Sequence, residues 1–324
     1  MSTPHRRSQE RPRPVPAADE VLLRVLAAGV VPAGRAARPG AAPPKGKPPK
    51  GKPPNGQPPK AEPPYGQPYG QPPCTPGLDV SGVVAAAGAD VTRFGAGDEV
   101  FGRIDDGGCA GHVTVPAGRL APKPATLDHV HAAGAPTAAL TAWQALIDVG
   151  RVGPGTRVLI HAADGGAGDV AVQLARAEGA YVVATARADR HGLVRDLGAD
   201  ELLDPAGADL AAVVHDIDVA LDLVGGADGP RTLGTLRPNG LLVCAVPGDP
   251  GLAPEDVEAR GMRFAVVRAE PSGERLAKAA GLLADGRLRV HVAAVLPFTE
   301  AAKARELCET GGAGGAVVLV PGRP

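Results

Sequence analysis

A glycine-rich turn between an apolar strand and a helix is the part of this sequence best suited to chemistry. The run VLIHAADGGAGDVAVQLARAEGAYVVATAR passes from a buried strand through the pattern Ala163-x-Gly165-x-x-Gly168 and continues directly as a helix. In such a turn the backbone can approach a pyrophosphate at Gly165, while helix and strand pack closely at Gly168. The free N–H groups of the helix start would bind the phosphates. This spacing favours a dinucleotide site over a plain structural turn.

The residues after the second strand bear on which dinucleotide is bound. NAD-binding proteins hold the ribose hydroxyl with an acidic residue about 20 positions after the glycines. Here Ala186 takes that place, and Arg187 and Arg190 follow. Two guanidinium groups suit a 2′-phosphate by charge and geometry, so the sequence favours NADPH over NADH; the alternative is solvated surface charge. Asp169, in the first turn of the helix, is expected to face outward, because an inward carboxylate would repel pyrophosphate.

The elements that would position these residues fall into two groups. After residue 127, a helical segment at 128–150 is followed by apolar strands and helices in alternation at 156–163, 169–179, 180–186, 191–199, 218–224 and 240–246. Strands without polar alternation predict a parallel sheet covered on both faces. Earlier, short β-branched runs punctuated by glycine predict a small barrel or sandwich from strands at 20–30, 77–88, 97–104 and 111–116. The segment at 273–320 is predicted to form a helix, a strand, a second helix and a second strand.

A proline-rich tract interrupts the first group of strands. Residues 43–76 hold 14 of the 35 prolines, in repeats close to x-G-[K/Q]-P-P. This composition favours polyproline II and coil over packing. We interpret the tract as a solvated spacer, which costs little entropy. The alternatives are a docking segment for a proline-binding partner, or a lid in which Tyr65 and Tyr69 fold over the active site.

Composition and charge exclude several classes of protein. The 324 residues suffice for two domains, and a formal net charge of −1 argues against nucleic acid or an anionic membrane as the main partner. The cysteines are widely spaced, without a C-x-x-C pair, so neither a disulfide framework nor a structural zinc site is indicated. The first 20 residues lack an apolar stretch of the kind found in a secretory signal. We expect a cytoplasmic protein that does not enter the membrane.

Several stretches together resemble the medium-chain dehydrogenase/reductase superfamily, specifically its zinc-free quinone oxidoreductase branch, which includes zeta-crystallin-like and polyketide enoyl reductase proteins. In chain order they are VLLRVLAAGV, PGLDVSGVV, GADVTRFGAGDEVFG, ALTAWQAL, VLIHAADGGAGDVAVQLARAEGA, LGADELLD, LDLVGG, TLRPNGLLV and GRLRVHVAAVLPFTEAAKARELCETG. The resemblance implies an α/β fold: a GroES-like β-barrel catalytic domain plus a Rossmann domain with a doubly wound parallel sheet. The expected bounds are 1–125 for the catalytic domain, with the insert at 43–76, then 126–262 for the NADP-binding domain, and 263–324 for a return to the catalytic domain.

The resemblance also assigns cofactor positions. Those that match the family's motifs are Thr141, Gly165, Gly166, Ala167, Gly168, Arg187, Arg190, Val224 and Gly225. The glycine turn would bind the pyrophosphate, and the two arginines would hold the 2′-phosphate. Thr141 would lie near the nicotinamide, and the turn at 224–225 would pass close to the cofactor. The zinc-ligand positions of zinc alcohol dehydrogenases correspond to Val31 and Leu78, which cannot bind a metal, so no metal is expected.

The substrate side departs from the family pattern. Val31 stands where relatives carry asparagine, and Cys109 and His112 replace two aromatic residues. His112 is a candidate proton donor, as are Tyr65 and Tyr69 in the tract; more often such a histidine is a partly exposed hydrogen-bonding residue.

We expect an NADPH-dependent, zinc-independent oxidoreductase that reduces a small electrophilic substrate, either a quinone or an activated C=C bond, by hydride transfer. One alternative is a reductase-like protein that binds nucleotide but is catalytically weak or inactive, with a binding or structural role. Another is a metal-free alcohol/ketone oxidoreductase. Relatives often form homodimers by joining their Rossmann sheets edge to edge, and GLLVCAV (240–246) is a candidate strand for such a contact, although the sequence does not show it.

Overall fold

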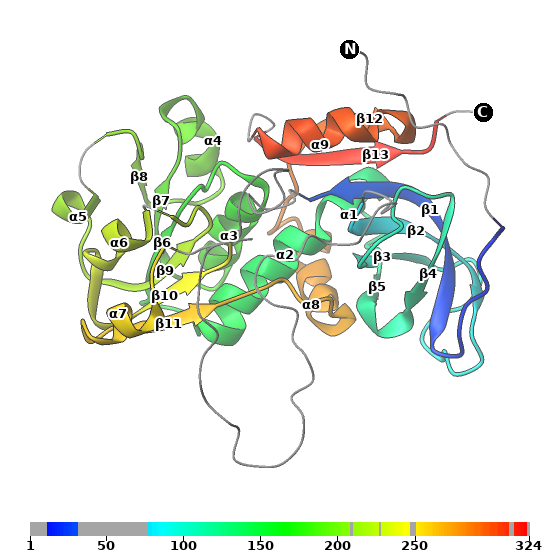
Figure 1. The fold of residues 1–324 in the computed structure, drawn as a ribbon, viewed down its shortest axis with the longest axis horizontal. Coiled ribbons are helices and arrows are strands. Elements are labelled where there is room, and N and C mark those ends of the chain that lie inside the picture. Colours follow the sequence, from blue (N-terminus) through cyan, green and yellow to red (C-terminus); the bar gives the residue numbers. More distant parts are fainter. Residues whose placement is uncertain are drawn as a thin grey trace, which may run out of the picture.

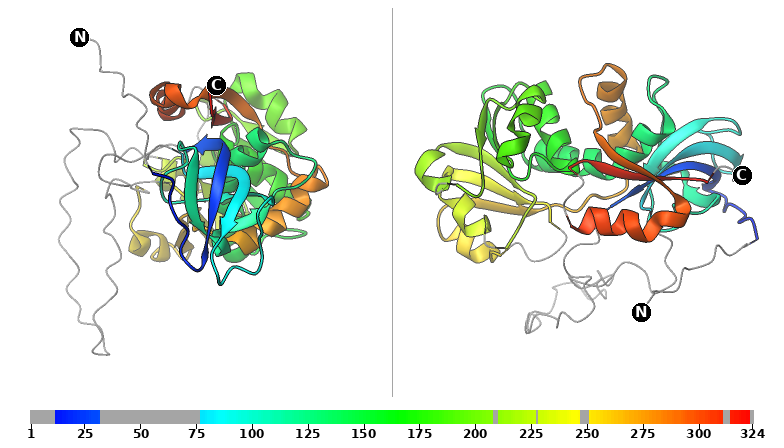
Figure 2. Two further views of the ribbon diagram at one scale, coloured as in Figure 1. Left: turned by 90° about the vertical axis from the view of Figure 1, so that its right-hand side faces the viewer. Right: turned by 90° about the horizontal axis from the view of Figure 1, so that it is seen from above.

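A computed structural model describes residues 12–31, 77–207, 210–226, 228–246, 251–310 and 314–322. Within these ranges the chain forms two lobes that lie side by side, with helices between them (Figures 1 and 2). The proline-rich tract at 43–76, with Tyr65 and Tyr69, lies outside the described residues, so its three proposed roles stay predictions.

The first lobe is a seven-stranded sheet in the order β12-β13-β1-β2-β3-β5, with β4 also paired to β1. Its strands are β1 (Glu20–Val30), β2 (Asp79–Ala87), β3 (Glu99–Arg103), β4 (His112–Pro116), β5 (Leu120–Pro122), β12 (Val292–Pro297) and β13 (Ala316–Val320). β1 and β2 are antiparallel neighbours, with Gly29 opposite Asp79. β13 pairs with β1, so the first and the last described strands are neighbours in this lobe. The strands expected at 20–30, 77–88, 97–104 and 111–116 are confirmed.

The second lobe is a six-stranded, wholly parallel sheet in the order β11-β10-β9-β6-β7-β8. Its strands are β6 (Arg157–Ile160), β7 (Tyr181–Thr185), β8 (Glu201–Leu203), β9 (Ile217–Asp222), β10 (Leu236–Cys244) and β11 (Arg263–Val266). The strand order reverses between β6 and β9, which makes the sheet doubly wound and confirms the expected Rossmann architecture.

Both faces of this sheet are buried, which explains its apolar strands without polar alternation. Val158 and Ile160 of β6 join one hydrophobic cluster with α3 (Gly166–Ala177), while Leu159 joins another with α5 (Leu210–Val213) and α6 (Asp228–Leu233). The remaining helices of this lobe are α4 (His191–Asp196), α7 (Pro254–Glu258) and a 3₁₀ turn, Ala188–Arg190.

Two expectations about this sheet need correction. The GLLVCAV segment was a candidate for an edge-to-edge dimer contact, but Gly240–Cys244 belongs to β10, which lies between β9 and β11. The sheet also extends past the expected domain boundary at 262, because β11 follows it and pairs in parallel with β10. In the described part of the chain, the edges are therefore β11 and β8, and a homodimer through this sheet would use one of them.

Helices between the sheets join the two lobes. They are α1 (His129–Gly134), α2 (Pro136–Ala142), a π-helical segment (Trp143–Val149) and α8 (Gly273–Ala284); α9 (Ala301–Glu309) covers β13, and 3₁₀ turns span Ala117–Arg119 and Phe298–Glu300. One hydrophobic cluster contains Phe101 of β3, Leu140 of α2, Leu276 of α8 and the inner face of β6. The lobes therefore share a continuous core.

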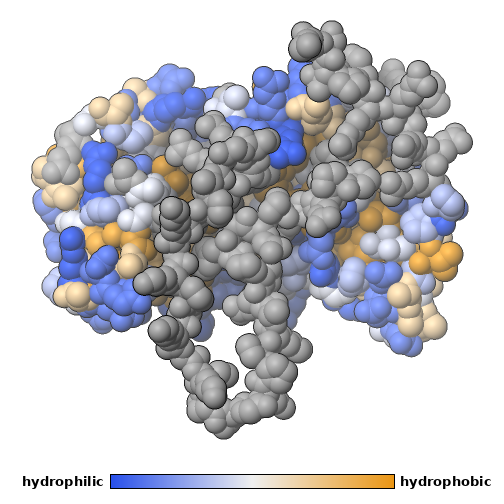
Figure 3. Space-filling model, in the orientation of Figure 1, coloured by the Kyte–Doolittle hydropathy of each residue, from blue (hydrophilic) through white to orange (hydrophobic). Residues whose placement is uncertain are grey.

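Apolar residues on the described surface of the face in Figure 3 are interspersed with hydrophilic ones. Among the described residues, none of the helices combines the length and the hydropathy that a membrane crossing requires.

Replacing Phe101 by alanine tests the shared core. Phe101 is 0% exposed, so the cavity left behind is expected to reduce the free energy of unfolding by about 3–5 kcal/mol. Chemical denaturation followed by circular dichroism measures the change. Val295→Ala is the control, because Val295 is 48% exposed and its loss should cost less than about 0.5 kcal/mol. Equal effects of the two substitutions would contradict the placement of Phe101 in the core.

Candidate functional site

The glycine turn lies between the end of β6 and the start of α3. Gly165 is extended (φ −103°, ψ 166°) and its N–H donates to the carbonyl oxygen of Ala162 at 3.0 Å. The first helical bond runs from Asp169 N–H to Gly165 C=O, so the N–H groups of Gly166, Ala167 and Gly168 precede it. Such N–H groups have no partner inside the helix and are available to a phosphate.

Gly168 is required by the packing of α3 against β6. A Cβ at this position would lie 2.1 Å from the carbonyl oxygen of Ala162, closer than any side chain can approach. A Cβ at Gly166 would have no neighbour within 4 Å, so that residue faces open space. The turn therefore has the two properties that a pyrophosphate loop needs: close strand–helix packing and an accessible backbone.

Asp169 corrects an expectation, because its side chain points inward rather than to solvent. It is 4% exposed, and its Oδ1 atom has no hydrogen-bond partner. The sheet lies on one side of α3 and α2 on another, so residues 168–175 are all buried. Burial raises the pKa of Asp169 to about 8, against the lowering effect of the Val170 N–H. The group is thus protonated near neutral pH and does not repel a phosphate.

A cavity of about 410 Å³ opens at the carboxyl ends of the strands on both sides of the switch between β6 and β9. Its walls include Ala162 and Asp164 of the glycine turn, Arg187 after β7, and Val224 after β9. Ligands of doubly wound sheets bind at this point. Of the cofactor residues expected from the sequence, Arg187 and Val224 line this cavity, and residues 165–168 follow directly after Asp164 of its wall.

The two arginines expected at the 2′-phosphate have different surroundings. Arg187 donates from Nε to Oδ2 of Asp164 at 2.8 Å, which holds its guanidinium beside the glycine turn. Arg190 is absent from the cavity wall. Its guanidinium instead lies against Gly314, where a Cβ would come within 2.3 Å of Nη2. Arg187 is therefore the better placed of the two to bind a phosphate in the cavity.

The turn after β9 is fixed by an aspartate that the sequence reasoning missed. Asp222 is fully buried, and its Oδ1 accepts hydrogen bonds from the N–H groups of Val224 (2.8 Å) and Gly225 (2.9 Å). Gly225 has a φ of 72°, which glycine adopts readily. Val224 is thereby held exposed in the cavity wall. The signal in the sequence was an aspartate at the carboxyl end of a mostly apolar strand, after the buried run Val219–Leu221.

His161, directly before the glycine turn, is a second residue that was missed. It lines the cavity, and its ring nitrogens contact Oγ1 of Thr185 (3.2 Å) and Oγ1 of Thr232 (2.9 Å). Burial lowers its pKa, against the raising effect of Asp222, so the ring is neutral. These contacts tie the ends of β6 and β7 to α6.

Thr141 and His112 lie outside the cavity wall. Thr141 is buried in α2, and its Oγ1 donates to the carbonyl oxygen of Thr137 at 2.7 Å. His112 begins β4, opposite Arg24 of β1. Burial, Arg13 and Arg24 all lower the pKa of His112, which makes it a poor proton donor at neutral pH. Its proposed role as an acid gains no support from this geometry.

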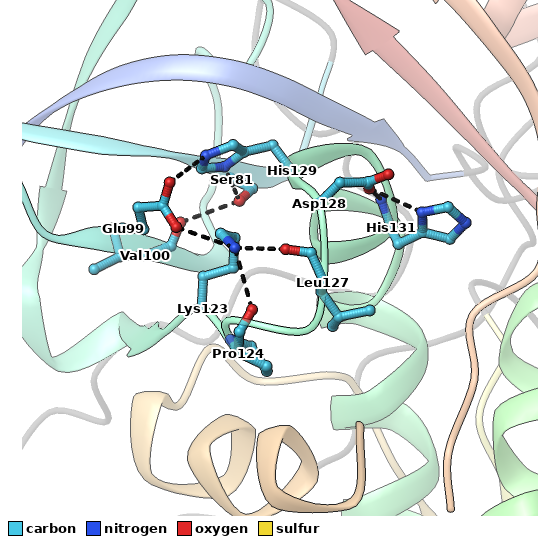
Figure 4. Close-up of polar contacts among 9 residues, drawn as sticks. All are labelled: Ser81, Glu99, Val100, Lys123, Pro124, Leu127, Asp128, His129 and His131. Atoms are coloured by element: carbon cyan, nitrogen blue, oxygen red, sulfur yellow. Dashed lines mark hydrogen bonds and ion pairs between the residues drawn. The ribbon is translucent and has the colours of Figure 1, made fainter. Parts of the chain in front are cut away.

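Ser81, His129 and Glu99 form a chain that resembles the triad of a hydrolase (Figure 4). Ser81 Oγ lies 2.8 Å from His129 Nδ1, and His129 Nε2 lies 3.2 Å from Glu99 Oε1. Ser81 is 0% exposed, and its hydroxyl also donates to the carbonyl oxygen of Val100, so no substrate can reach it. Lys123 joins Glu99 to the loop that precedes α1. These hydrogen-bonded side chains anchor the loop before α1 to the first sheet.

Leu78 and Val31 adjoin β2 and β1, where zinc alcohol dehydrogenases carry ligands. Within the described ranges, no three His, Cys, Asp or Glu side chains gather closely enough to hold a metal ion.

Substituting Gly168 by alanine should disturb both the fold and the turn. The new Cβ would collide with Ala162 C=O, so we expect a loss of about 1–3 kcal/mol of stability and weaker dinucleotide binding. Gly166→Ala is the matched control for packing, because its Cβ meets open space. Thermal unfolding of both variants measures the difference. A stable Gly168→Ala protein would contradict the close contact between α3 and β6.

Asp169 should make the stability of the protein depend on pH. Its folded pKa of about 8 lies above the ordinary value of 3.8, so its stabilising contribution is complete below pH 4 and is lost as pH rises through 8. As pH rises from about 4 to about 8, the free energy of unfolding of the wild type should therefore fall by on the order of a few kcal/mol relative to that of Asp169→Asn. Denaturant unfolding of both proteins from pH 5 to 9 measures the difference. A constant difference across this range would show that Asp169 is not buried as described.

Comparisons with known proteins agree with this architecture. Family models match as "Alcohol dehydrogenase GroES-like domain" over residues 17–125 and "Zinc-binding dehydrogenase" over residues 197–319. A 2-haloacrylate reductase from a Burkholderia species is 32% identical over 276 residues, which cover 78% of this chain and 82% of that protein. The mouse NAD(P)H oxidoreductase RTN4IP1, mitochondrial, is 39% identical over 175 residues, covering 51% of this chain. That match spans only 44% of the mouse protein's length.

Solved structures match nearly the whole chain. The quinone oxidoreductase from Coxiella burnetii has a TM-score of 0.76 and 27% identity, with 96% of this chain and 93% of that chain covered. Mycobacterial Rv1454c complexed with NADPH has a TM-score of 0.80 and 27% identity, with 97% and 95% covered. With its barrel lobe, doubly wound sheet and glycine turn, the chain belongs to the medium-chain dehydrogenase/reductase superfamily, in its quinone oxidoreductase branch.

Proposed function

We propose that the protein is an NADPH-dependent oxidoreductase that reduces a quinone or an activated C=C bond, as in an enone or enoyl compound. The observation that carries the proposal is the cavity beside the glycine turn, with Arg187 held in its wall by Asp164. Relatives named as an NAD(P)H oxidoreductase, a 2-haloacrylate reductase and a quinone oxidoreductase support the same chemistry.

The residues around the cavity fit a dinucleotide that carries an extra phosphate. Gly168 permits the tight turn, and the N–H groups before the first helical bond suit the pyrophosphate. No acidic residue ends β7; Ala186 and Arg187 follow it instead. Of the three aspartates in the cavity wall, Asp164 pairs with Arg187 and Asp228 with Arg231, so arginines offset the charge of these two. The third, Asp204, accepts a hydrogen bond from the N–H of Ala206. When bound, NADPH would supply a hydride.

Each part of the site has a separate task in this proposal. The start of α3 holds the pyrophosphate, Arg187 binds the 2′-phosphate, and Asp222 keeps the turn at 224–225 in place against the cofactor. Leu202, Leu203 and Leu210 supply an apolar wall. The substrate is a small electrophile bound between the lobes. The mouse relative's name includes "mitochondrial", so a cytoplasmic location for this chain stays a prediction.

Calorimetric titration with NADPH and NADH tests the cofactor. We expect NADPH to bind at least about tenfold more tightly, because a charge-assisted hydrogen bond contributes about 1.5–3 kcal/mol. Arg187→Met should remove that preference. Arg195→Met on α4 is the control, since it removes the same charge from an exposed position outside the cavity wall. Equal affinity of the wild type for both cofactors would contradict the assignment of Arg187.

Turnover with a panel of quinones and enones tests the reaction, with NADPH oxidation followed by absorbance at its reduced nicotinamide band. The expected result is steady turnover of at least one electron-poor acceptor. Tight NADPH binding without turnover of any acceptor would favour the nucleotide-binding alternative, and oxidation of simple alcohols would favour the alcohol/ketone alternative.

A further inference from the structure

Arg103, the last residue of β3, is held at the junction of the two lobes. Its Nε donates to Oγ1 of Thr137 in α2 at 3.1 Å. Its Nη1 donates to the carbonyl oxygen of Ala269, in the segment that follows β11 of the parallel sheet. The guanidinium of Arg103 thus joins the first lobe, which contains β3, to helix α2 and to the second lobe, which contains β11. Two hydrogen bonds fix its orientation.

The buried carboxyl group of Asp79 holds Thr137, the partner of Arg103, in place. Asp79 Oδ1 accepts from the Thr137 hydroxyl at 2.7 Å, and Asp79 Oδ2 accepts from the Thr137 N–H at 2.9 Å. Burial raises the pKa of Asp79 to about 6, although the bonds from Thr137 and the charge of Arg103 lower it. Asp79 is therefore ionised at neutral pH. Asp79 therefore acts on Arg103 in two ways: its charge attracts the guanidinium, although no ion pair within 4 Å joins Arg103 to a carboxylate among the described residues, and its hydrogen bonds hold Thr137 in place.

The guanidinium of Arg103 has N–H donors that its hydrogen bonds to Thr137 and Ala269 do not use. An arginine carries five N–H groups, and the bonds to Thr137 and Ala269 use two of them. Among the described residues, the hydrogen bonds of Arg103 come from Nε and Nη1 and none comes from Nη2, and the side chain is only half-buried. A fixed positive group with free N–H donors at the junction of two lobes is suited to bind an oxygen that carries negative charge.

Arg103 is also close to the residue expected beside the nicotinamide. Thr141 donates to the carbonyl oxygen of Thr137 at 2.7 Å, so both threonines lie on the same face of α2, one turn apart. Arg103 contacts Thr137 directly. The guanidinium therefore lies about one helical turn from Thr141, the distance at which a small substrate could contact both.

We propose that Arg103 is a catalytic residue that binds the carbonyl oxygen of the substrate and stabilises the negative charge formed there; this rests on the proposed function. When a hydride from the reduced cofactor adds to the β-carbon of an enone, the C=C electron pair forms a new double bond to the carbonyl carbon. The C=O electron pair then moves to the oxygen, giving an enolate. A proton from water adds to the α-carbon, and the saturated ketone results. A quinone places charge on its oxygen in the same way.

Kinetics of Arg103→Met test the claim. Loss of one donor to a developing oxyanion lowers kcat by about 100-fold or more, and we expect that loss in kcat/KM with both enones and quinones. NADPH affinity should change much less, because the proposed phosphate contacts of the cofactor are at the glycine turn and Arg187, whereas Arg103 contacts Thr137 and Ala269. Arg93→Met is the matched control, since it removes an exposed arginine of the same lobe that stacks on Phe94. Unchanged kcat/KM in Arg103→Met would overturn the proposal.

Arg103→Lys covers the case in which the methionine variant fails to fold. Lysine keeps the charge but cannot reach Thr137, Ala269 and the substrate together, so we expect a loss of about tenfold in kcat/KM. Thermal unfolding of each variant separates loss of fold from loss of catalysis. A folded Arg103→Lys protein with the wild-type kcat/KM would likewise overturn the proposal.

Binding of 4-nitrophenol gives a readout that does not need turnover. In the presence of saturating NADP⁺, the wild type should lower the pKa of the bound phenol, seen as more of the yellow phenolate at a fixed pH near 6, and Arg103→Met should not. If the wild type turns over no acceptor but still ionises the phenol through Arg103, the proposed reaction fails and the anion site stands. If turnover occurs and neither readout depends on Arg103, the anion site fails and the proposed reaction stands.

Discussion

The contact between Gly168 and the carbonyl oxygen of Ala162 is the constraint on which the rest of the site depends. No side chain fits at this point, so α3 can begin directly against the end of β6. That approach turns the first N–H groups of the helix toward the edge of the sheet where β6 and β9 diverge. The cavity, the arginine after β7 and the turn after β9 all meet at this edge. A helix set further from the strand would leave a pyrophosphate without its main-chain donors.

Local patterns predicted the elements well because each element's own residues determine them. The apolar strands of the parallel sheet, the alternation with helices and the glycine turn are visible within short windows, and all were confirmed. Sheet order is a different kind of information. The segment at 240–246 has the composition of any buried strand, and only the later strand β11 decides that it is not an edge. Asp169 was misjudged for a related reason, since α2, distant in sequence, covers that side of α3.

Contacts between the lobes were the least predictable features. Arg103 meets Ala269, and Gln144 exchanges two hydrogen bonds with the backbone of Glu270, at 3.0 and 3.3 Å. These partners are more than a hundred residues apart, and nothing in the local sequence marks them. The positions of Arg187 and Arg190 were unpredictable for the same reason. The sequence shows their charge and spacing, but it does not show which group each guanidinium contacts. Asp164 holds the first near the cavity, and the second lies against the loop before β13.

The pairing of β1 with β2 has a consequence for how this chain can change in evolution. Gly29 faces Asp79 across the ladder, so the residues on either side of the 32–76 segment enter and leave the barrel as neighbours, like the two legs of a hairpin. Because the two strands that flank this segment are already paired, repeats can be gained or lost without shifting the register of any strand, and doubling the length of a flexible connection costs only about 0.6 kcal/mol. Repeat expansion by replication slippage would therefore be nearly neutral here. A single residue inserted in β1 or β2, unless a bulge took it up, would turn the later side chains of that strand to the wrong face.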